Sequence, residues 1–188
     1  MIKDFVLASG SKQRIGLLQR IGFEPKKIQP ADIDETPKKG EKPSAYVKRM
    51  AMEKAKAVAK LAPQEAILSA DTIVVEGGKI IQKAANAEEQ TKIMQRLSGK
   101  SHKVLTAVCV IDKKGKTSLK LSTTKIIAKR MSKQEIKEFV DGEDWVGSCG
   151  YKIENVEYLV KKIIGSYSGV IGLPLYETKN MLNSAGVK

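Results

Sequence analysis

The sequence predicts an α/β (α+β) protein built on a mixed central sheet flanked by helices. In the first half of the chain, apolar strand-like runs alternate with segments of helical spacing, whereas the middle has the pattern of hairpins. The 188 residues are 41% hydrophobic and 29% charged, which is typical of a folded globular chain. We therefore expect a single domain over 1–188, with or without two lobes around a cleft.

The first half predicts strands and helices in turn. The expected elements are a buried strand at 5–7, a helix at 15–21 closed by Gly22, a strand at 28–33, a polar loop at 35–42, a helix from Pro43 to about Leu61 and a strand at 66–70. Proline suits the first turn of the long helix, because its missing N–H has no partner there. Helical spacing predicts that the buried face of this helix carries Tyr46, Val47, Met50, Ala57 and Val58. The same spacing places Lys54 on or beside that face.

The second half predicts hairpins followed by two further helices. The expected elements are a hairpin over 73–81 that turns at Gly77-Gly78, a helix at 87–97, long strands at 102–112 and 118–130, a helix after Ser132, a strand at 156–164 and a last helix beginning at Pro174. Ser132 followed by Glu135 is a capping box, which fixes the start of that helix.

The net charge of +13 requires an explanation. The 34 lysines and arginines are spread along the chain without a block of five like charges, and aromatic residues make up only 5%. A nucleic-acid surface usually combines clustered cations with stacking platforms. The pattern favours a polyanionic small molecule and makes nucleic acid an unlikely partner, although a basic nucleic-acid-binding module stays open.

The remaining composition excludes several classes of protein. No window approaches the ~18 apolar residues of a membrane span, and the N-terminus does not resemble a signal peptide. We therefore expect a cytoplasmic protein that does not bind membranes. Cys109 and Cys149 form no metal-ligand pattern and are expected to be reduced. His102 is the only histidine, which excludes a histidine-rich metal site, and we interpret it as structural.

Two predicted strands run directly into polar residues. The first is followed by Ala8-Ser9-Gly10-Ser11 and then by Lys12, Gln13 and Arg14; the strand at 66–70 is followed by Asp71 and Thr72. Backbone N–H groups, hydroxyls and an arginine at a helix N-terminus bind anions, whereas the alternative is an ordinary turn with a helix cap. Because ligands in such sheets collect where strands stop, we expect both loops to share one site.

Acids and lysines complete the candidate set. Asp32, Asp34 and Glu35 lie in one short segment, and carboxylates suit Mg²⁺ or Mn²⁺; the alternative is a solvated acidic loop. Asp71 is either a site residue placed by a rigid strand or a turn cap. Lys54 and Lys83 would reach a phosphate as point charges, or else they are solvated lysines.

Seven segments decide between these alternatives by resemblance. They are LASGSKQRIGLLQRIG (7–22), DIDETP (32–37), AMEKAKAVA (51–59), SADTIVV (69–75), GGKIIQKA (77–84), RLSGKSHKVLTAV (96–108) and GSYSGVIGLPLYET (165–178). In order and spacing the chain resembles the Maf-type nucleoside triphosphate pyrophosphatases. The resemblance implies an inosine-triphosphatase-like fold, with a long mixed sheet and two lobes around a cleft. It implies hydrolysis between the α- and β-phosphates with a divalent metal, and a homodimer.

The resemblance also implies roles for individual residues. Ser9 and Arg14 match the phosphate loop, Glu35 the acid of the family's Glu-Thr-Pro segment, Lys54 the helix lysine, Asp71 the acid that accepts a proton and Lys83 the lysine of the Gly-Lys-Pro segment. On this basis Glu35 and Asp71 would hold Mg²⁺ or Mn²⁺. Ser11 and Lys12 would join the phosphate contacts, and Gln13, Thr72 and Glu154 would line the base pocket.

The chain departs from the family pattern at three places. It reads Ser11-Lys12-Gln13-Arg14 where the family typically has Ser-Pro-Arg-Arg, and Gln82-Lys83-Ala84 where the family has Gly-Lys-Pro. Glu154 stands where the thymidine/uridine branch has glutamine and resembles the branch that acts on methylated guanosine triphosphate. Asp71-Thr72 instead resembles the thymidine/uridine branch, so both base specificities stay open. A catalytically weakened nucleotide-binding regulatory protein is the alternative to an enzyme.

Overall fold

The computed structural model describes residues 1–188. Its elements are β1 (Val6–Leu7), α1 (Lys12–Arg20), β2 (Lys27–Ile28), α2 (Pro43–Leu61), β3 (Ile67–Glu76), β4 (Lys79–Ile81), α3 (Ala87–Leu97), β5 (Ser101–Ile111), β6 (Thr117–Ala128), α4 (Lys133–Asp141), α5 (Ile153–Val156), the 3-10 helix η1 (Glu157–Leu159), β7 (Val160–Ile164), α6 (Tyr167–Ile171) and α7 (Leu175–Ser184). No helix combines the length and the apolar character that a membrane crossing requires.

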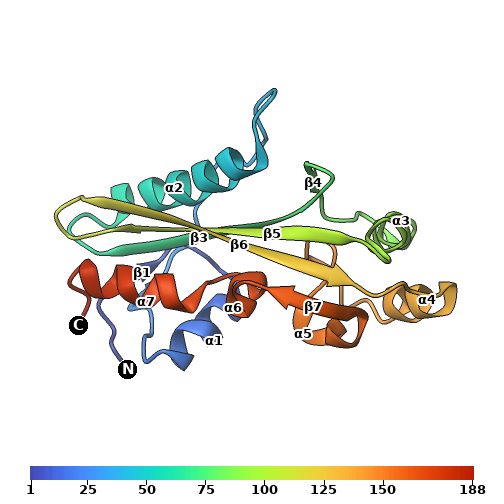
Figure 1. Cartoon of the computed structure of the whole chain (residues 1–188). Coiled ribbons are helices and arrows are strands. Elements are labelled where there is room, and N and C mark those ends of the chain that lie inside the picture. Colours follow the sequence, from blue (N-terminus) through green and yellow to red (C-terminus); the bar gives the residue numbers. More distant parts are fainter.

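All seven strands belong to one mixed sheet with the order β2-β1-β3-β5-β6-β7, and β4 pairs with β3. β1 runs parallel to β2 and β3, whereas the other pairs are antiparallel. The long strands β3, β5 and β6 cross the whole molecule, with α2 on one face and α1, α6 and α7 on the other (Figure 1). Helices α3 and α4 lie together at one end, and both chain termini lie at the other.

Each face of the sheet has its own apolar core, because side chains alternate along a strand. On the α2 face, Val47, Met50 and Val58 of the helix pack with Ile67 of β3 and Leu105 of β5. On the opposite face, Phe5, Leu7 of β1 and Leu68 of β3 pack in one cluster with Leu18 of α1 and with Met181 and Leu182 of α7. The sheet is therefore held rigid by packing on both of its faces.

The predicted fold class, a mixed sheet flanked by helices, is confirmed. Three predicted boundaries are wrong. The strand expected at 28–33 is only the two-residue β2, and the strand expected at 156–164 begins as α5 and η1 and becomes β7 only at Val160. Within α2, Ala57 is half-buried, whereas Ala55 is fully buried and belongs to the core.

The third wrong boundary concerns Asp71 and Thr72. They lie in the middle of β3 and not at a strand end, because Asp71 pairs with Ala107 and Thr72 with Thr106 of β5. The strand continues through the polar pair since β5 supplies backbone partners from Ile67 to Val75. The prediction that both polar segments follow strand ends therefore holds only for the loop after β1.

The other edge of β3 explains why a cleft forms there. β1 pairs with Ile67 and Leu68, and β4 pairs with Val74 to Glu76. Because β5 occupies one edge of β3, both partners share the second edge, and neither one pairs with residues 69–73. Asp71 is the central residue of this unpaired stretch, which we call the β3 gap. A rigid strand thus presents a carboxylate where no neighbouring strand covers its edge.

Candidate active site

A cleft of about 610 Å³ opens at the β3 gap. It brings together nine of the eleven predicted site residues, namely Ser11, Gln13, Arg14, Glu35, Lys54, Asp71, Thr72, Lys83 and Glu154. Ser9 lies behind this lining and contacts Arg14, whereas Lys12 is exposed and does not line the cleft. Residues as far apart in sequence as Ser11 and Glu154 therefore meet in one cavity.

Lys54 links the two predicted acids. Its Nζ atom lies 2.7 Å from Oδ1 of Asp71 and 3.0 Å from Oε1 of Glu35. The side chains of Lys54 and Asp71 are only 12% and 10% exposed, whereas that of Glu35 is 53% exposed. Lys54 comes from α2, Asp71 from β3 and Glu35 from the loop before α2, so the contact joins three separate elements.

The loop that carries Glu35 is held by α2. The Tyr46 hydroxyl donates to the Glu35 carbonyl oxygen at 2.8 Å, and Arg49 Nη2 donates to the Thr36 carbonyl oxygen at 3.1 Å. Arg49 also donates from Nε and Nη2 to the two carboxylate oxygens of Glu41, each at 2.7 Å. This bidentate contact holds the pKa of Glu41 down at about 2. The backbone around Glu35 is thus fixed although its side chain is exposed.

Arg14 is positioned by contacts from three directions. Its Nη1 donates to Ser9 Oγ at 2.8 Å, its Nε donates to the Gly172 carbonyl oxygen at 3.0 Å and its Nη2 lies 3.5 Å from Thr72 Oγ1. Ser11 caps α1 by accepting from the Arg14 N–H, which places Arg14 in the first turn of the helix. Burial lowers the pKa of Arg14, and the charges of Asp71 and Glu35 oppose that shift.

Gly172 accepts the Arg14 hydrogen bond from a backbone conformation that favours glycine. Its φ of +133° lies in the region that side chains disfavour, whereas a Cβ atom there would lie 3.5 Å from Arg14 Nε, which is an ordinary contact. The segment before it is seated on the sheet by two threonines, because Thr106 Oγ1 donates to the Gly169 carbonyl oxygen at 2.7 Å and Thr72 Oγ1 lies 3.0 Å from Thr106 Oγ1. The segment from Gly165 to Gly172 is therefore held against the sheet, and it holds Arg14 through the Gly172 carbonyl oxygen.

Residues 147–154 form one wall of the cleft. Two buried polar side chains hold this wall in place. Gln90 Nε2 donates to the Gly150 carbonyl oxygen, and His102 Nε2 hydrogen-bonds the Tyr151 hydroxyl. Burial lowers the pKa of His102 to about 4, so its ring is neutral at ordinary pH. The structural role expected for His102 is consistent with this contact, although its Nδ1 atom has no partner.

Lys83 and Cys149 occupy the cleft without an acidic partner. Lys83 follows β4, is exposed and makes no ion pair, so its ammonium faces the opening alone. Cys149 is a free, half-buried cysteine whose pKa is raised by burial, which makes it a poor nucleophile. Gln13 accepts a hydrogen bond from Ser11 Oγ at 3.2 Å, and Glu154 lies in the first turn of the short helix α5.

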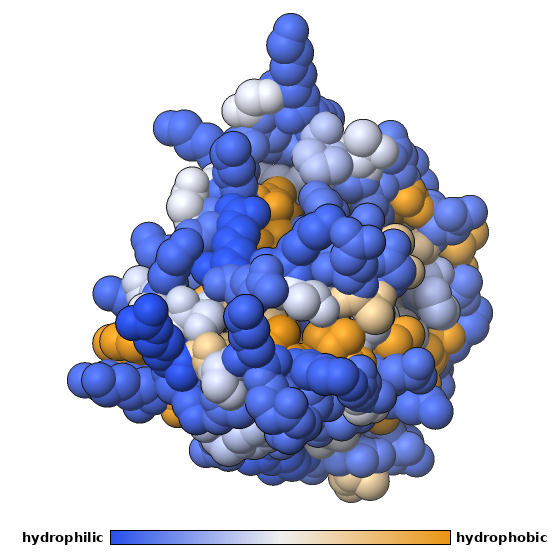
Figure 2. Space-filling view, turned by 90° about the vertical axis from the view of Figure 1, so that its right-hand side faces the viewer, coloured by the Kyte–Doolittle hydropathy of each residue, from blue (hydrophilic) through white to orange (hydrophobic).

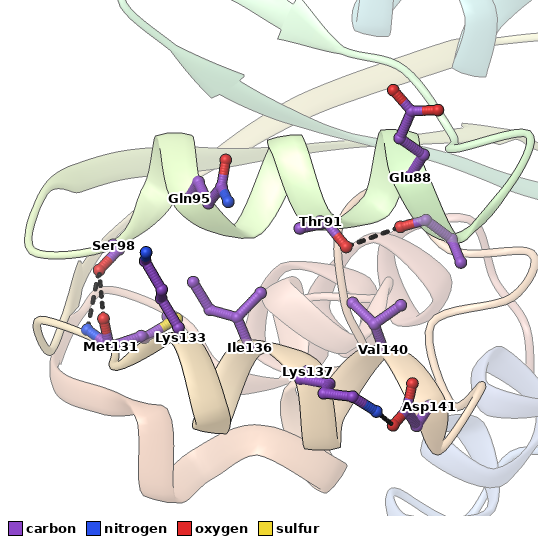
Figure 3. Close-up of a pocket in the computed structure, with 11 residues that line it drawn as sticks. Glu88, Thr91, Gln95, Ser98, Met131, Lys133, Ile136, Lys137, Val140 and Asp141 are labelled. Carbon is purple, nitrogen blue, oxygen red and sulfur yellow. Dashed lines mark hydrogen bonds and ion pairs between the residues drawn. The ribbon is translucent and has the colours of Figure 1, made fainter.

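A second hollow of about 630 Å³ lies between α3 and α4 (Figure 3). Ile136 and Val140 form part of its lining, and charged groups such as Glu88, Lys133 and Asp141 surround them. Viewed from this end, the surface is mostly hydrophilic with apolar groups in a band across the middle (Figure 2). The polar contacts of its lining residues include contacts within one helix, as between Lys137 and Asp141. None of the predicted site residues lines this hollow, so the candidate site is the cleft at the β3 gap.

Sequence reasoning did not identify several residues that shape the cleft. Tyr46 and Arg49 fix the Glu35 loop, and Thr106 and Gly172 fix Arg14. Thr106 and Gly172 lie in the segments RLSGKSHKVLTAV and GSYSGVIGLPLYET. These segments contribute to the family resemblance, which assigns no site role to residues within them. Tyr46 and Arg49 carried no signal of their own, because an aromatic and a cation on a long helix are usually core and surface residues.

Comparison with known proteins identifies the family. The model of the family described as "Maf-like protein" matches residues 4–185, which is nearly the whole chain. The chain belongs to the Maf family. The predicted resemblance to this family is therefore confirmed.

Curated relatives of this Maf-family chain share one name. A "dTTP/UTP pyrophosphatase" from Zymomonas mobilis subsp. mobilis is 44% identical over 188 residues, covering 99% of this chain and 93% of the relative. A "dTTP/UTP pyrophosphatase" from Rhodopseudomonas palustris strain HaA2 is 41% identical, covering 96% of this chain and 91% of the relative. In structure, the chain is similar to a HAM1 protein from Coxiella burnetii, with a TM-score of 0.53 and 14% identity over 98% of this chain and 100% of that one. That similarity concerns the fold alone.

Proposed function

We propose that this protein hydrolyses dTTP, UTP or a closely related pyrimidine nucleoside triphosphate to the monophosphate and pyrophosphate. One observation carries the proposal: Lys54 lies between Glu35 and Asp71, in the same cleft as the buried Arg14, in a Maf-family chain. The chain is a nucleoside triphosphate pyrophosphatase, a hydrolase that acts on acid anhydrides. This class rests on family membership and on the name that its relatives share.

Binding of the triphosphate begins with the loop after β1. Ser11, Gln13 and Arg14 line the cleft at the start of α1, where backbone N–H groups and the helix dipole favour an anion. Arg14 is held by Ser9 and Gly172 before any ligand binds, so little order is lost when it contacts phosphate oxygens. Lys83 adds a mobile positive charge at the opening.

Asp71 is the proposed general base. Its carboxylate orients a water molecule and accepts one of its protons as the water oxygen attacks the α-phosphorus. The bond between the α-phosphorus and the oxygen bridging to the β-phosphorus breaks, and its electron pair leaves with pyrophosphate. Lys54 and Lys83 offset the negative charge that develops on this leaving group. Strand β3 holds Asp71 rigidly because its backbone is paired with β5.

The oxygen donors of the cleft fit a divalent cation whose remaining ligands come from the substrate. Glu35 and Asp71 supply two carboxylates bridged by one lysine, and no group of three or more His, Cys, Asp or Glu forms a preassembled metal site. Mg²⁺ is commonly bound by one or two carboxylates together with substrate phosphates. We propose that Glu35 and Asp71 hold Mg²⁺ or Mn²⁺, which would neutralise phosphate charge when bound.

The base pocket is proposed to involve Thr72 and Glu154, beside the wall that carries Tyr151. The names of the relatives favour thymine and uracil over methylated guanine. Release of pyrophosphate should be measured with Mg²⁺ or Mn²⁺ across dTTP, UTP, dCTP, GTP and 7-methyl-GTP. Fastest turnover of dTTP and UTP with pyrophosphate as product is expected, and preference for a methylated guanosine triphosphate would overturn the assignment of the base.

The pyrophosphate assay, together with measurements of nucleotide binding and of nucleic-acid binding, separates the alternatives. Saturable nucleotide binding without pyrophosphate release would indicate a regulatory nucleotide-binding protein. Salt-sensitive binding of RNA or DNA without turnover would indicate a nucleic-acid module. A homodimer, which the family resemblance implies, and a cytoplasmic location, which the sequence composition predicts, complete the proposal.

A further inference from the structure

Lys54 occupies the space between the two carboxylates that are proposed to bind metal. Its ammonium contacts Asp71 at 2.7 Å and Glu35 at 3.0 Å, and its side chain is only 12% exposed. No other lysine or arginine forms an ion pair with either acid. One monovalent cation thus serves both acids in this state of the cleft.

A divalent cation would compete with Lys54 for the same two carboxylates, of which the lysine contacts Oδ1 of Asp71 and Oε1 of Glu35. Two carboxylates carry two negative charges, so a bound divalent ion next to the lysine would leave an excess of positive charge in a partly buried site. Like charges a few ångströms apart repel strongly when water does not screen them. Arg14 adds to this repulsion because it lines the same cleft. Metal binding to the cleft without nucleotide is therefore disfavoured as long as Lys54 keeps its contacts with both acids.

We propose that Lys54 is a resident counter-ion that excludes free metal, so that the divalent cation binds productively only together with the triphosphate. The inference rests on the proposed function. Phosphate oxygens would supply both the missing ligands of the metal and a new partner for the Lys54 ammonium. The flexible four-carbon side chain allows this exchange without movement of α2.

Two features of the cleft support the exchange. Only two carboxylates, those of Glu35 and Asp71, lie together on Lys54, so the protein alone provides an incomplete shell for Mg²⁺ or Mn²⁺. Lys54 is placed on a helix whose neighbours Ala51, Ala55 and Val58 are fully buried, so its backbone is fixed and only its side chain is able to swing. The predicted consequence is reciprocal: nucleotide tightens metal binding, and metal tightens nucleotide binding by the same factor.

The test measures the affinity of the protein for Mn²⁺ in the absence of nucleotide. Electron paramagnetic resonance gives the concentration of the free ion. The variants are Lys54→Met, which removes the ammonium and keeps the apolar stem, and Lys54→Gln as a second variant should the first fail to fold. Lys83→Met is the matched control, since it removes one positive charge from the same cleft without freeing a carboxylate. The double variant Lys54→Met with Glu35→Gln tests whether the acids hold the ion.

We expect Lys54→Met, or Lys54→Gln, to bind Mn²⁺ about tenfold or more tightly than the wild type, because the competing state is removed. Lys83→Met should change the affinity by about threefold or less, as a general charge effect. The double variant should lose the gain. Equal affinity of wild type and both Lys54 variants would overturn the inference, as would an equal gain in Lys83→Met. Because no nucleotide is present, this failure is distinct from a failure of the proposed reaction, which wild-type pyrophosphate release tests separately.

Discussion

Arg49 and Glu41 form a bidentate ion pair, with both N–O distances at 2.7 Å, at the base of the loop that carries Glu35. The same guanidinium donates to the Thr36 carbonyl oxygen and lies 5.5 Å from the centre of the Tyr46 ring. Tyr46 in turn donates to the Glu35 carbonyl oxygen. The position of the exposed Glu35 carboxylate is therefore set by Tyr46, which lines the cleft, and by the Arg49–Glu41 pair, which does not.

Replacement of Arg49 by lysine should weaken catalysis without unfolding the protein. Lysine keeps the charge but cannot make two parallel hydrogen bonds to Glu41, so the Glu35 loop should loosen. We expect kcat/KM to fall by about tenfold or more, with a higher Mg²⁺ concentration needed for half-maximal rate. Steady-state kinetics at several Mg²⁺ concentrations measures this. Glu53→Gln is the control, because it removes only the 3.3 Å contact of Arg49; an equal loss in both variants would refute a specific role of the Glu41 pair.

Lys83→Met should raise KM for the triphosphate while leaving the fold intact. Lys83 is exposed and has no acidic partner, so its removal breaks no internal contact. A charge-assisted phosphate contact is worth about tenfold in affinity, which is the expected rise in KM at low salt. The difference from wild type should shrink as ionic strength increases, because the exposed charge is screened. An unchanged KM at low salt would remove Lys83 from the site.

Gln13→Arg should strengthen the phosphate loop. Gln13 lines the cleft and stands where the family typically has arginine. A guanidinium there adds a bidentate donor for phosphate oxygens, so KM for the triphosphate should fall by about threefold to tenfold. Initial rates over a range of triphosphate concentrations measure the change. Gln13→Lys should give a smaller decrease, since an ammonium is a point charge. A higher KM in Gln13→Arg would indicate that Gln13 serves the base and not the phosphates.

His102 should make the stability of the protein fall in acid. Its folded pKa is about 4, below the ordinary value of 6.5, because burial disfavours the charged ring. Between pH 6.5 and pH 4 the ring is therefore protonated in the unfolded chain but neutral in the folded chain. The free energy of unfolding consequently falls as pH decreases through 6.5 towards 4. This group alone should remove about 2 kcal/mol between pH 7 and pH 5.

Urea unfolding of wild type and His102→Gln at both pH values tests this. The variant loses the Tyr151 contact at every pH, so its stability should be lower at pH 7 but should depend less on pH. If both proteins lose the same free energy between pH 7 and pH 5, His102 is not the titrating group.

Individual residues show what the sequence alone could predict. Arg14 and Asp71 are site candidates because each follows an apolar strand-like run, whereas Lys54 becomes one only through the family resemblance, since a lysine beside a buried helix face is usually solvated. The continuity of β3 through Asp71 and Thr72 was missed, since the register with β5 depends on residues more than thirty positions away. The β3 gap follows from β1 and β4 sharing one edge, which no local pattern encodes.

The supporting contacts were missed for the same reason. Thr106 and Gly169 are 63 positions apart, and Arg14 and Gly172 are 158 apart. Each of these residues is ordinary in its own segment. Local patterns and the family resemblance together therefore predict which groups do chemistry, whereas long-range pairing decides how these groups are held.

The most direct test of the account is the turnover of Asp71→Asn with dTTP and UTP, measured as pyrophosphate release. Asparagine keeps the shape of the side chain but cannot accept the proton of water, so kcat should fall by about 100-fold to 10,000-fold. Asp32→Asn is the matched control, because Asp32 is exposed, comes from the same segment as Glu35 and does not line the cleft, and it should retain wild-type turnover. A folded Asp71→Asn protein that turns over within about twofold of wild type would contradict the assignment of Asp71 as the base.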